Sequence, residues 1–146
     1  MNLIIQPATE TDSHPIKKLL DDNDLPTSDL DQSNVHLFIG LIDSKMAGVI
    51  GIEKRNNVGL LRSLAVEDSF KGQGVGRELT LKLIDLCTSD NIEKLFLLTM
   101  TAKKYFEKFG FVEIDRVEVP DEIKQTREFK DICPASSVVM YKELKS

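Results

Sequence analysis

The sequence predicts a single α/β domain with a mixed, mostly antiparallel central sheet of about seven strands flanked by helices. Three observations support this: seven short apolar runs of strand type, three segments with helical periodicity, and an alternation of the two in the second half of the chain. At 146 residues the chain can bury a core but is too short for two domains of ordinary size. We therefore expect one domain, residues 1–146, with one site.

The strand-type runs are apolar throughout or alternate apolar and polar residues. They cover residues 3–6, 35–42, 47–53, 60–66, 95–99, 111–119 and 138–141. Asp43-Ser44 and Asn56-Asn57 lie between neighbouring runs, and both pairs are typical of tight turns. The second, third and fourth strands are therefore expected to form an antiparallel meander.

Three segments place apolar residues three or four positions apart, on one face of a helix. They are marked by Ile16, Leu19 and Leu20, by Val75, Leu79, Leu83, Leu86 and Cys87, and by Ala102, Phe106 and Phe109. The second and longest segment lies between the strand-type runs 60–66 and 95–99. Because such a strand–helix–strand connection joins parallel strands, we expect one parallel crossover there.

Composition excludes several classes of protein. The formal net charge is -5, whereas nucleic-acid binding requires clustered Lys and Arg, so no nucleic-acid partner is expected. The apolar runs are far shorter than a bilayer span, and no basic segment precedes an apolar core at the start of the chain. We expect a cytoplasmic protein without a membrane partner. Cys87 and Cys133 should then be free thiols, and their spacing to His14 and His36 predicts no metal site.

A glycine-rich loop connects the fourth strand-type run to the long helix. Gly72, Gly74 and Gly76 remove side chains where the chain turns, so backbone N–H groups can converge on an anion. These groups precede a helix, where unpaired donors and the dipole favour negative charge. Lys71 and Arg77 add local positive charge. The pattern predicts a phosphate cradle, although glycines also serve helix packing and tight turns.

Two other phosphate-binding loops fit this segment poorly. A P-loop requires Gly-Lys-Ser/Thr, but Gly76 is followed by Arg77-Glu78. A dinucleotide fingerprint requires a glycine where Leu79 stands.

The loop reads Lys71-Gly72-Gln73-Gly74-Val75-Gly76 and follows Leu64-Ala65-Val66. Further along the chain, Tyr105-Phe106-Glu107-Lys108-Phe109-Gly110-Phe111 forms an aromatic segment that ends in Gly-Phe. Together these motifs resemble the GCN5-related N-acetyltransferase (GNAT) superfamily, whose signature Arg/Gln-x-x-Gly-x-Gly/Ala follows a strand ending in Leu-x-Val. The resemblance covers roughly residues 3–144.

The resemblance implies acetyl-CoA as co-substrate and a GNAT-like fold in which strands four and five splay apart to admit the pantetheine arm. The backbone of the Leu-x-Val strand would bind the arm, and the glycine loop would bind the pyrophosphate. The residues implied for the cofactor are Leu64, Ala65, Val66, Lys71, Gly72, Gln73, Gly74, Val75, Gly76, Arg77, Thr101 and Phe106. Lys71 replaces the usual Arg or Gln, which keeps a positive charge but loses the planar fork of arginine.

The resemblance also implies a direct attack of an amine on the thioester in a ternary complex. The Leu64 N–H would stabilise the oxyanion. Leu60 occupies the usual place of a carboxylate base, so Glu53 acting through water is the candidate base, although it also fits the solvent-facing end of its strand. Phe106 occupies the usual place of the tyrosine acid. Tyr105, about 100° away around the helix, is the candidate acid.

After the fifth strand, Thr101 replaces a frequent Asn and also suits a helix N-cap. This region is similar to the subgroup of glutamate-type amino-acid acetyltransferases and arsenic-resistance-associated acetyltransferases, which implies a small amino-acid-like amine as substrate. Arg62, within an apolar strand, is the candidate for binding the substrate carboxylate through two bonds, and Arg127 is the second. Either could instead be a surface arginine with a packed stem.

Two alternatives to this function stay open. One is a non-catalytic acyl-CoA-binding module, because Leu60 and Phe106 replace the usual base and acid. The other is a protein N-acetyltransferase acting on a basic peptide, which the acidic net charge would attract. Family resemblance also implies a homodimer, formed through late strands such as residues 138–141.

Overall fold

The computed structural model describes residues 2–31, 34–132 and 137–144. Within them, the strands are β1 (Leu3–Pro7), β2 (Val35–Ile42), β3 (Lys45–Arg55), β4 (Val58–Val66), β5 (Lys94–Thr99), β6 (Val112–Ile114) and β7 (Val138–Glu143). The helices are α1 (Ser13–Asp22), α2 (Val75–Ser89), α3 (Lys103–Glu107) and α4 (Asp121–Lys124). Short 3-10 turns lie at Glu10–Asp12, Asp68–Phe70 and Arg116–Glu118, and a π-helical turn at Glu128–Ile132.

The strands form one mixed sheet in the order β1-β2-β3-β4-β5-β7-β6. β1 to β4 pair antiparallel, β4 and β5 pair parallel, and β7 pairs antiparallel with both β5 and β6. Asp43 and Ser44, with φ of 51° and 66°, and Asn56, with φ of 57°, form the two hairpin turns of the meander. The predicted antiparallel meander and the parallel crossover through α2 are confirmed.

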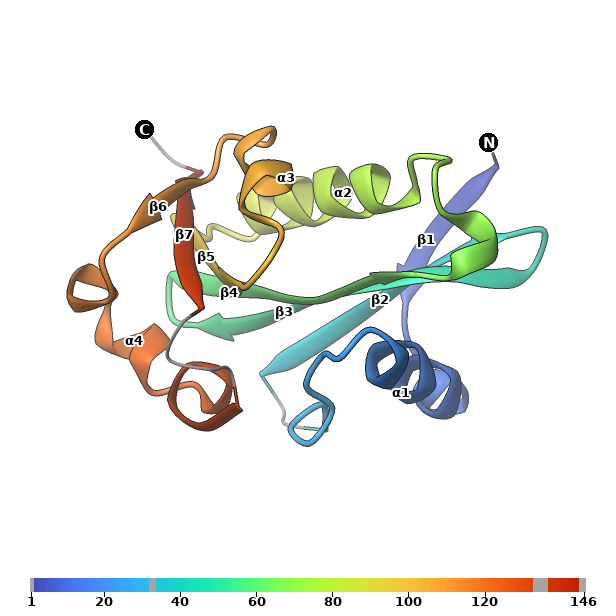
Figure 1. The fold of residues 1–146 in the computed structure, drawn as a ribbon, viewed down its shortest axis with the longest axis horizontal. Coiled ribbons are helices and arrows are strands. Elements are labelled where there is room, and N and C mark those ends of the chain that lie inside the picture. The colour runs from blue at the N-terminus through green and yellow to red at the C-terminus, as the bar shows by residue number, and fades with distance from the viewer. Residues whose placement is uncertain (1, 32–33, 133–136, 145–146) are drawn as a thin grey trace.

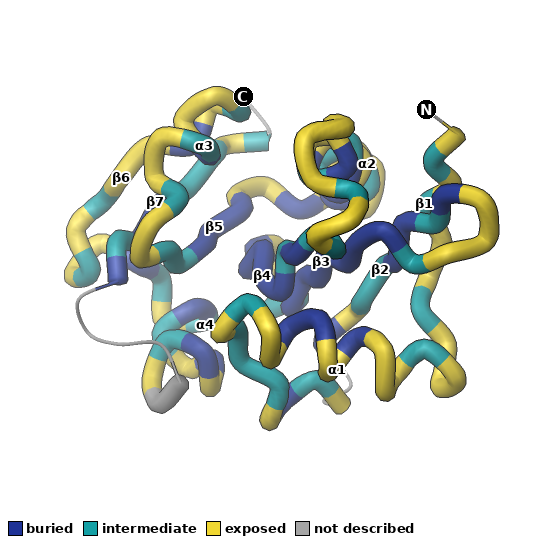
Figure 2. Tube along the Cα trace, turned by 45° about the vertical axis from the view of Figure 1, so that its right-hand side comes forward, coloured by how far each residue is buried: buried dark blue, intermediate teal, exposed yellow. Residues whose placement is uncertain are grey.

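The helices cover both faces of the sheet. α2 and α3 lie on one face, and α1 and α4 lie on the other (Figure 1). The buried part of the trace follows the central strands and the inner faces of the helices (Figure 2). Three apolar clusters pack the helices against the sheet: one under α2 on the first face, and one each under α1 and α4 on the other. Leu79 of α2, Leu20 of α1 and Ile123 of α4 are fully buried in them. Across the described residues, no helix combines the length and apolar character that a membrane span requires.

Two predictions about the late strands are corrected. The run 111–119 forms a strand only at Val112–Ile114. The β6 ladder pairs these three residues with Tyr141, Met140 and Val139 of β7 and ends at Ile114. β7 itself lies between β5 and β6, so it is an inner strand and not the exposed edge that the dimer prediction used; the homodimer stays a prediction. The short α4 was not predicted.

β4 and β5 diverge in the middle of the sheet. They pair only over Val58 to Leu60 and Lys94 to Phe96. Beyond this point β4 stays with β3 while β5 stays with β7. β4 also has a bulge: the β3–β4 ladder skips Ser63, which has φ of 60°, and Leu64. The splay implied by the resemblance is confirmed, and it opens the sheet beside the bulge.

Candidate functional site

The glycine loop ends in an uncapped helix N-terminus. Gly72 and Gly74 have φ of 81° and 85°, and Gly74 is the N-cap of α2. No side chain caps the first turn, so the backbone N–H groups there are not taken by a capping side chain. A Cβ on either glycine would have no heavy atom within 4 Å, so the positive φ and not a lack of space requires glycine. The loop has the geometry of an anion cradle.

Two exposed cations flank this cradle. Lys71 lies 2.9 Å from Asp68, and its hydrogen bond and its charge lower the pKa of that carboxyl. Arg77 lies 3.3 Å from Glu78. Exposed pairs of this kind are weak, so either side chain can turn toward an anionic ligand at little cost.

Two hollows meet at the splayed end of β4, and both are lined by Asn23, Leu64 and Tyr105. Because they share these three residues, they form one cleft with Leu64 at its centre. The loop hollow, beside the glycine loop, is also lined by Ala65, Val66, Phe70, Lys71, Gly72, Gly74, Val75, Gly76 and Arg77. The inner hollow, of about 500 Å³, is also lined by Asp24, Leu25, Pro26, Leu61, Arg62, Ser63, Leu97, Leu98, Thr99, Met100, Thr101, Ala102, Phe106, Glu128 and Ser137.

Most of the predicted cofactor residues line the loop hollow, with three differences. Gln73 is exposed and lines neither hollow, and Thr101 and Phe106 line the inner hollow instead. Thr101 is not the N-cap of α3: that position is Ala102, whose N–H donates to the Thr99 hydroxyl at 2.9 Å. α3 thus begins later than the sequence predicted, and no side chain caps its first turn.

The Tyr105 hydroxyl faces the start of α2. It interacts with the Thr80 hydroxyl, which donates to the Gly76 carbonyl at 2.8 Å. A Cβ on Gly76 would lie 3.0 Å from the Tyr105 hydroxyl, so glycine allows the phenol to approach the helix. Burial raises the pKa of Tyr105 against the opposing effects of Thr80 and Arg77, which keeps the phenol protonated at neutral pH.

Phe106, at the usual place of a tyrosine acid, is buried. Its ring packs edge-on against Phe111 and Tyr105, with centroids 5.9 Å and 5.2 Å away. Leu60, at the usual place of a base, is fully buried in the apolar cluster under α4. Neither residue offers a proton donor or acceptor.

The guanidinium of Arg62 is already engaged. Its Nη1 and Nη2 each donate to a different carboxylate oxygen of Asp29 at 2.6 Å, and Nη1 also donates to Glu53 at 3.3 Å. The side chains of Arg62 and Asp29 are both fully buried. The sequence predicted that this arginine offers its fork to a substrate; in the structure Asp29 occupies the fork. An arginine within an apolar strand signals a buried acid, but the sequence does not show which of several nearby aspartates supplies it.

Glu53 is not at the solvent-facing end of its strand. Its side chain is fully buried between two arginines, and its second oxygen accepts from Arg55 Nη2 at 2.7 Å. It lines neither hollow, because Arg62 stands between it and the cleft. These contacts make Glu53 an ion-pair partner, and its role as a water-relayed base stays a prediction.

Sequence reasoning missed two carboxylates on the cleft wall. Asp24 is exposed at the end of the α1 turn, and Glu128 is buried in the π-helical turn after α4. Both lie in irregular segments, where no periodicity indicates the direction of a side chain. Arg127 is exposed and lines neither hollow, but its charge helps to lower the pKa of Asp29. It directly precedes Glu128, which lines the inner hollow.

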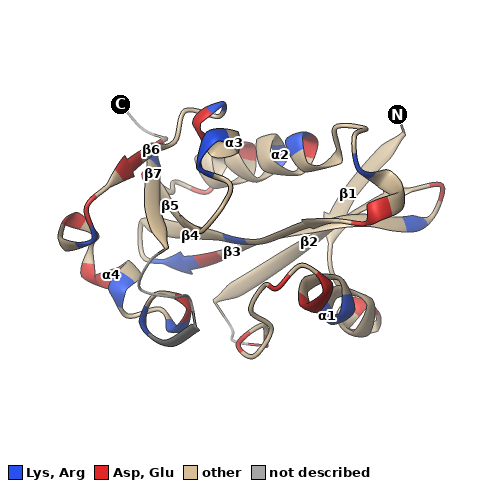
Figure 3. Ribbon diagram, viewed as in Figure 1, with Lys and Arg blue, Asp and Glu red and all other residues tan. Residues whose placement is uncertain are grey.

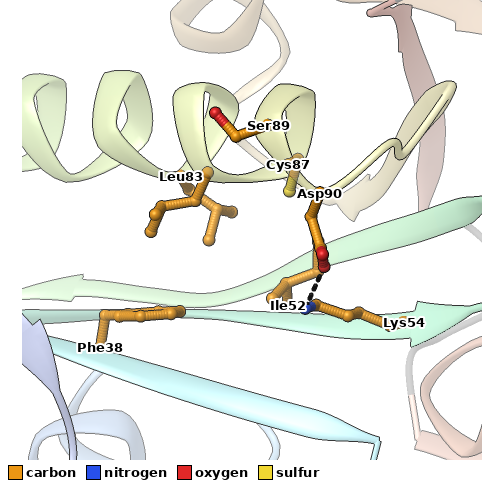
Figure 4. A pocket seen from close by; sticks show the side chains of 8 residues that line it. Phe38, Ile52, Lys54, Leu83, Cys87, Ser89 and Asp90 are labelled. Carbon is orange, nitrogen blue, oxygen red and sulfur yellow. Dashed lines mark hydrogen bonds and ion pairs between the residues drawn. The ribbon is translucent and has the colours of Figure 1, made fainter.

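A separate hollow of about 290 Å³ lies under the C-terminal half of α2, the end of the helix away from the glycine loop (Figure 4). Phe38, Leu83 and Cys87 give it an apolar lining, and an ion pair between Lys54 and Asp90 lies at its rim. Burial raises the pKa of the Cys87 thiol to about 12, so it is an inert core thiol. Cys133 lies outside the described residues. Among the described residues, no three His, Cys, Asp or Glu side chains gather as metal ligands.

The splayed strands, the uncapped glycine loop and the aromatic α3 all border one cleft. The sequence profile of the acetyltransferase (GNAT) domain matches residues 7–127. The chain belongs to the GNAT family. Its cleft, bounded by β4, β5 and the start of α2, is formed by the two motifs that carried the resemblance in the sequence.

Two curated relatives are similar to part of this GNAT chain. An uncharacterised N-acetyltransferase of Chlorobaculum tepidum is 32% identical over 63 residues, 43% of this chain and 40% of that protein. An amino-acid acetyltransferase of Mycobacterium tuberculosis is 26% identical over 78 residues, 53% of this chain and 41% of that protein. The matches thus span about two fifths of each relative's length. N-acetylglutamate synthase of Neisseria gonorrhoeae, solved with coenzyme A and N-acetyl-glutamate, has the same fold, with a TM-score of 0.83 and 20% sequence identity. The superposition covers 100% of this chain and 36% of that one.

Proposed function

We propose that this GNAT chain transfers an acetyl group from acetyl-CoA to the amine of a small, amino-acid-like acceptor, by direct attack in a ternary complex. The observation that carries the proposal is the continuity of the cleft. The loop hollow and the inner hollow share Asn23, Leu64 and Tyr105, so ligands bound in both would meet beside Leu64.

The loop hollow fits the anionic end of acetyl-CoA. Gly72 and Gly74 have the positive φ that opens a cradle, and Lys71 and Arg77 supply charge. The uncapped first turn of α2 supplies N–H donors to the pyrophosphate. When bound, acetyl-CoA supplies an acetyl thioester that is activated toward an amine. The backbone of Leu64, Ala65 and Val66 would bind the pantetheine arm along the splayed edge of β4.

The proposed polar groups lie around Leu64. Its N–H, in the bulge of β4, would donate to the acetyl carbonyl oxygen as negative charge develops there. A water held against Glu128 would accept the proton of the amine, since this carboxylate lines the inner hollow whereas Glu53 does not. The thiolate product would take its proton from water, because the Tyr105 hydroxyl faces Gly76 and Thr80.

An amino-acid-like acceptor is supported by the curated Mycobacterium tuberculosis relative, an amino-acid acetyltransferase, and by the fold shared with N-acetylglutamate synthase. Since Asp29 occupies the fork of Arg62, the exposed Arg127 is the cation we propose for the acceptor carboxylate. Arg127 directly precedes Glu128, which lines the inner hollow.

One observation favours a second candidate, a module that binds acyl-CoA without catalysis. The two positions that usually carry base and acid are occupied by Leu60 and Phe106, and both are buried. Such a module would use the loop hollow in the same way.

The distinguishing experiment incubates the protein with acetyl-CoA and a panel of amino acids, polyamines and peptides, and follows the release of free thiol. The proposal predicts amine-dependent release with at least one small amino acid. Binding of acetyl-CoA without release across the panel would establish the second candidate instead. Release with basic peptides alone would establish a protein N-acetyltransferase.

A further inference from the structure

We infer that Arg62 is a positioning residue, which holds the acceptor wall of the cleft in register with the strand that carries the Leu64 N–H. The inference rests on the proposed function of the cleft. It assigns Arg62 a role through its contacts with Asp29 and Ser63 instead of a contact with substrate. Figure 3 shows few charged segments along the central strands. The charged residue of β4 is Arg62.

The first contact fixes the wall. Residues 23–31 belong to the connection between α1 and β2, and Asn23 to Pro26 line the inner hollow. The start of this segment is tied to α1, because the Leu25 N–H donates to the Leu20 carbonyl at 2.9 Å. Its far end is tied to the sheet by the two 2.6 Å bonds from Arg62 to Asp29. The wall is therefore held both within the residues that face the cleft, at Leu25, and beyond them, at Asp29.

The second contact fixes the bulge. Arg62 Nε donates to the Ser63 hydroxyl at 3.2 Å. Ser63 has φ of 60°, a left-handed conformation that is unfavourable for a residue with a Cβ and persists where its surroundings enforce it. The next residue is Leu64, so the orientation of its N–H depends on the bulge. One guanidinium thus contacts both the acceptor wall and the bulge.

The same contacts argue against Arg62 as a substrate ligand. A substrate carboxylate would have to displace Asp29, whose side chain is fully buried and makes two bonds with favourable geometry. Glu53 adds a second negative charge 3.3 Å from Nη1. The positive charge of Arg62 is therefore balanced within the protein before any substrate binds.

The test compares Arg62→Gln and Asp29→Asn with the wild type. Kinetics use the most active acceptor of the amine panel, and calorimetry measures the Kd of acetyl-CoA. If that acceptor is an amino acid, its α-carboxamide is assayed beside it. Asp22→Asn is the matched control, because it removes the acid of an exposed pair with Lys18 at the end of α1. Hydrogen exchange follows the amides of residues 23–31 in each variant.

We expect both variants to raise the acceptor KM about tenfold or more, since small misplacements of reacting groups are costly. The loss should be the same for the amino acid and its α-carboxamide. The Kd of acetyl-CoA should stay within about twofold, and exchange should accelerate in residues 23–31; Asp22→Asn should change none of these. Ser63→Ala, which removes only the Nε acceptor, should give a smaller rise in KM if Arg62→Gln does not fold.

Two results would overturn the inference. A loss confined to the amino acid, with its α-carboxamide unaffected, would make Arg62 a carboxylate ligand. Lower thermal stability with unchanged acceptor KM and unchanged exchange in residues 23–31 would make the pair purely structural. A wild type that binds acetyl-CoA but acetylates no amine would refute the proposed function itself. Hydrogen exchange would then test the inference without kinetics: unchanged exchange of residues 23–31 in Arg62→Gln and Asp29→Asn would reject the role of the ion pair in holding this wall.

Discussion

Asp29 and Arg62, 33 residues apart in the sequence, form a buried ion pair in which both terminal nitrogens of the arginine bond to the carboxylate at 2.6 Å. The pair joins the segment between α1 and β2 to β4. Burial raises the pKa of Asp29, but the hydrogen bonds and charge of Arg62 outweigh it, so the net shift is downward.

Removing one partner should be costly. Asp29→Asn is expected to lower the free energy of unfolding at pH 7 by about 3–5 kcal/mol, because it leaves the charge of Arg62 buried and only partly compensated. Urea unfolding measures the loss. The exposed pair of Lys18 and Asp22 serves as control, and Asp22→Asn should cost less than about 1 kcal/mol. Equal losses in the two variants would contradict this assignment of energies.

The contribution of Asp29 should also depend on pH in a defined direction. Because its folded pKa lies below the unfolded value of 3.8, the stabilisation is fully present above that value and is lost as pH falls through the folded pKa. The stability difference between wild type and Asp29→Asn, measured by urea unfolding from pH 7 downward, should be constant to about pH 4 and then shrink. A difference that grows with acidification would show that the folded pKa is raised.

The glycine loop offers a test of backbone conformation. Gly74→Ala should weaken acetyl-CoA binding several-fold, because a left-handed φ costs a residue with a Cβ about 1–2 kcal/mol. Gly74→Asn is the matched variant, since asparagine tolerates this conformation better and should lose less. Calorimetric titration gives both Kd values. Equal losses of affinity in the two variants would contradict the role of positive φ and would assign the effect to side-chain bulk, although a Cβ at Gly74 meets no heavy atom within 4 Å.

Tyr105→Phe separates two roles of the phenol. Since its hydroxyl faces Gly76 and Thr80, the variant should weaken acetyl-CoA binding a few-fold and leave kcat within about threefold. The measurements are calorimetric Kd and the pH profile of kcat. A kcat lower by about 100-fold, together with loss of the alkaline limb, would instead establish Tyr105 as the general acid.

Cys87 should not react in the folded protein. Its pKa of about 12 leaves almost no thiolate at pH 8, and its side chain is buried beneath α2. In a Cys133→Ser variant, iodoacetamide should label Cys87 only after denaturation, as mass spectrometry of the two states would show. Labelling of the native state at the rate of an exposed thiol would contradict its core position.

The central architecture could be predicted because burial leaves a signal in the sequence. β2 was predicted with its observed bounds, and α2 through its apolar spacing, since both bury long regular faces. β6 was predicted too long, because its extent is set by its ladder with the distant β7, which ends at Ile114. Tertiary pairing of this kind leaves no trace in the local sequence.

The site divides in the same way. The cofactor loop was predicted from its glycines, whose positive φ is a local requirement. The environment of Arg62 was not, because Asp29 and Glu53 reach it from distant segments. A charged residue in an apolar strand indicates a buried partner, and that expectation would have favoured an ion pair over a ligand site.

The most direct test of the central claim is a calorimetric titration of the protein with acetyl-CoA. The cleft predicts saturable binding at one site, with a Kd between about 1 μM and 1 mM, in the range of enzyme substrates. A variant with both Gly72→Val and Gly74→Val should bind acetyl-CoA at least about tenfold more weakly, because both positions require positive φ. It should keep the fold, because both positions are exposed and lie outside the core. Absence of saturable binding by the wild type at millimolar acetyl-CoA, or equal binding by the double variant, would contradict the assignment of the glycine loop to the cofactor.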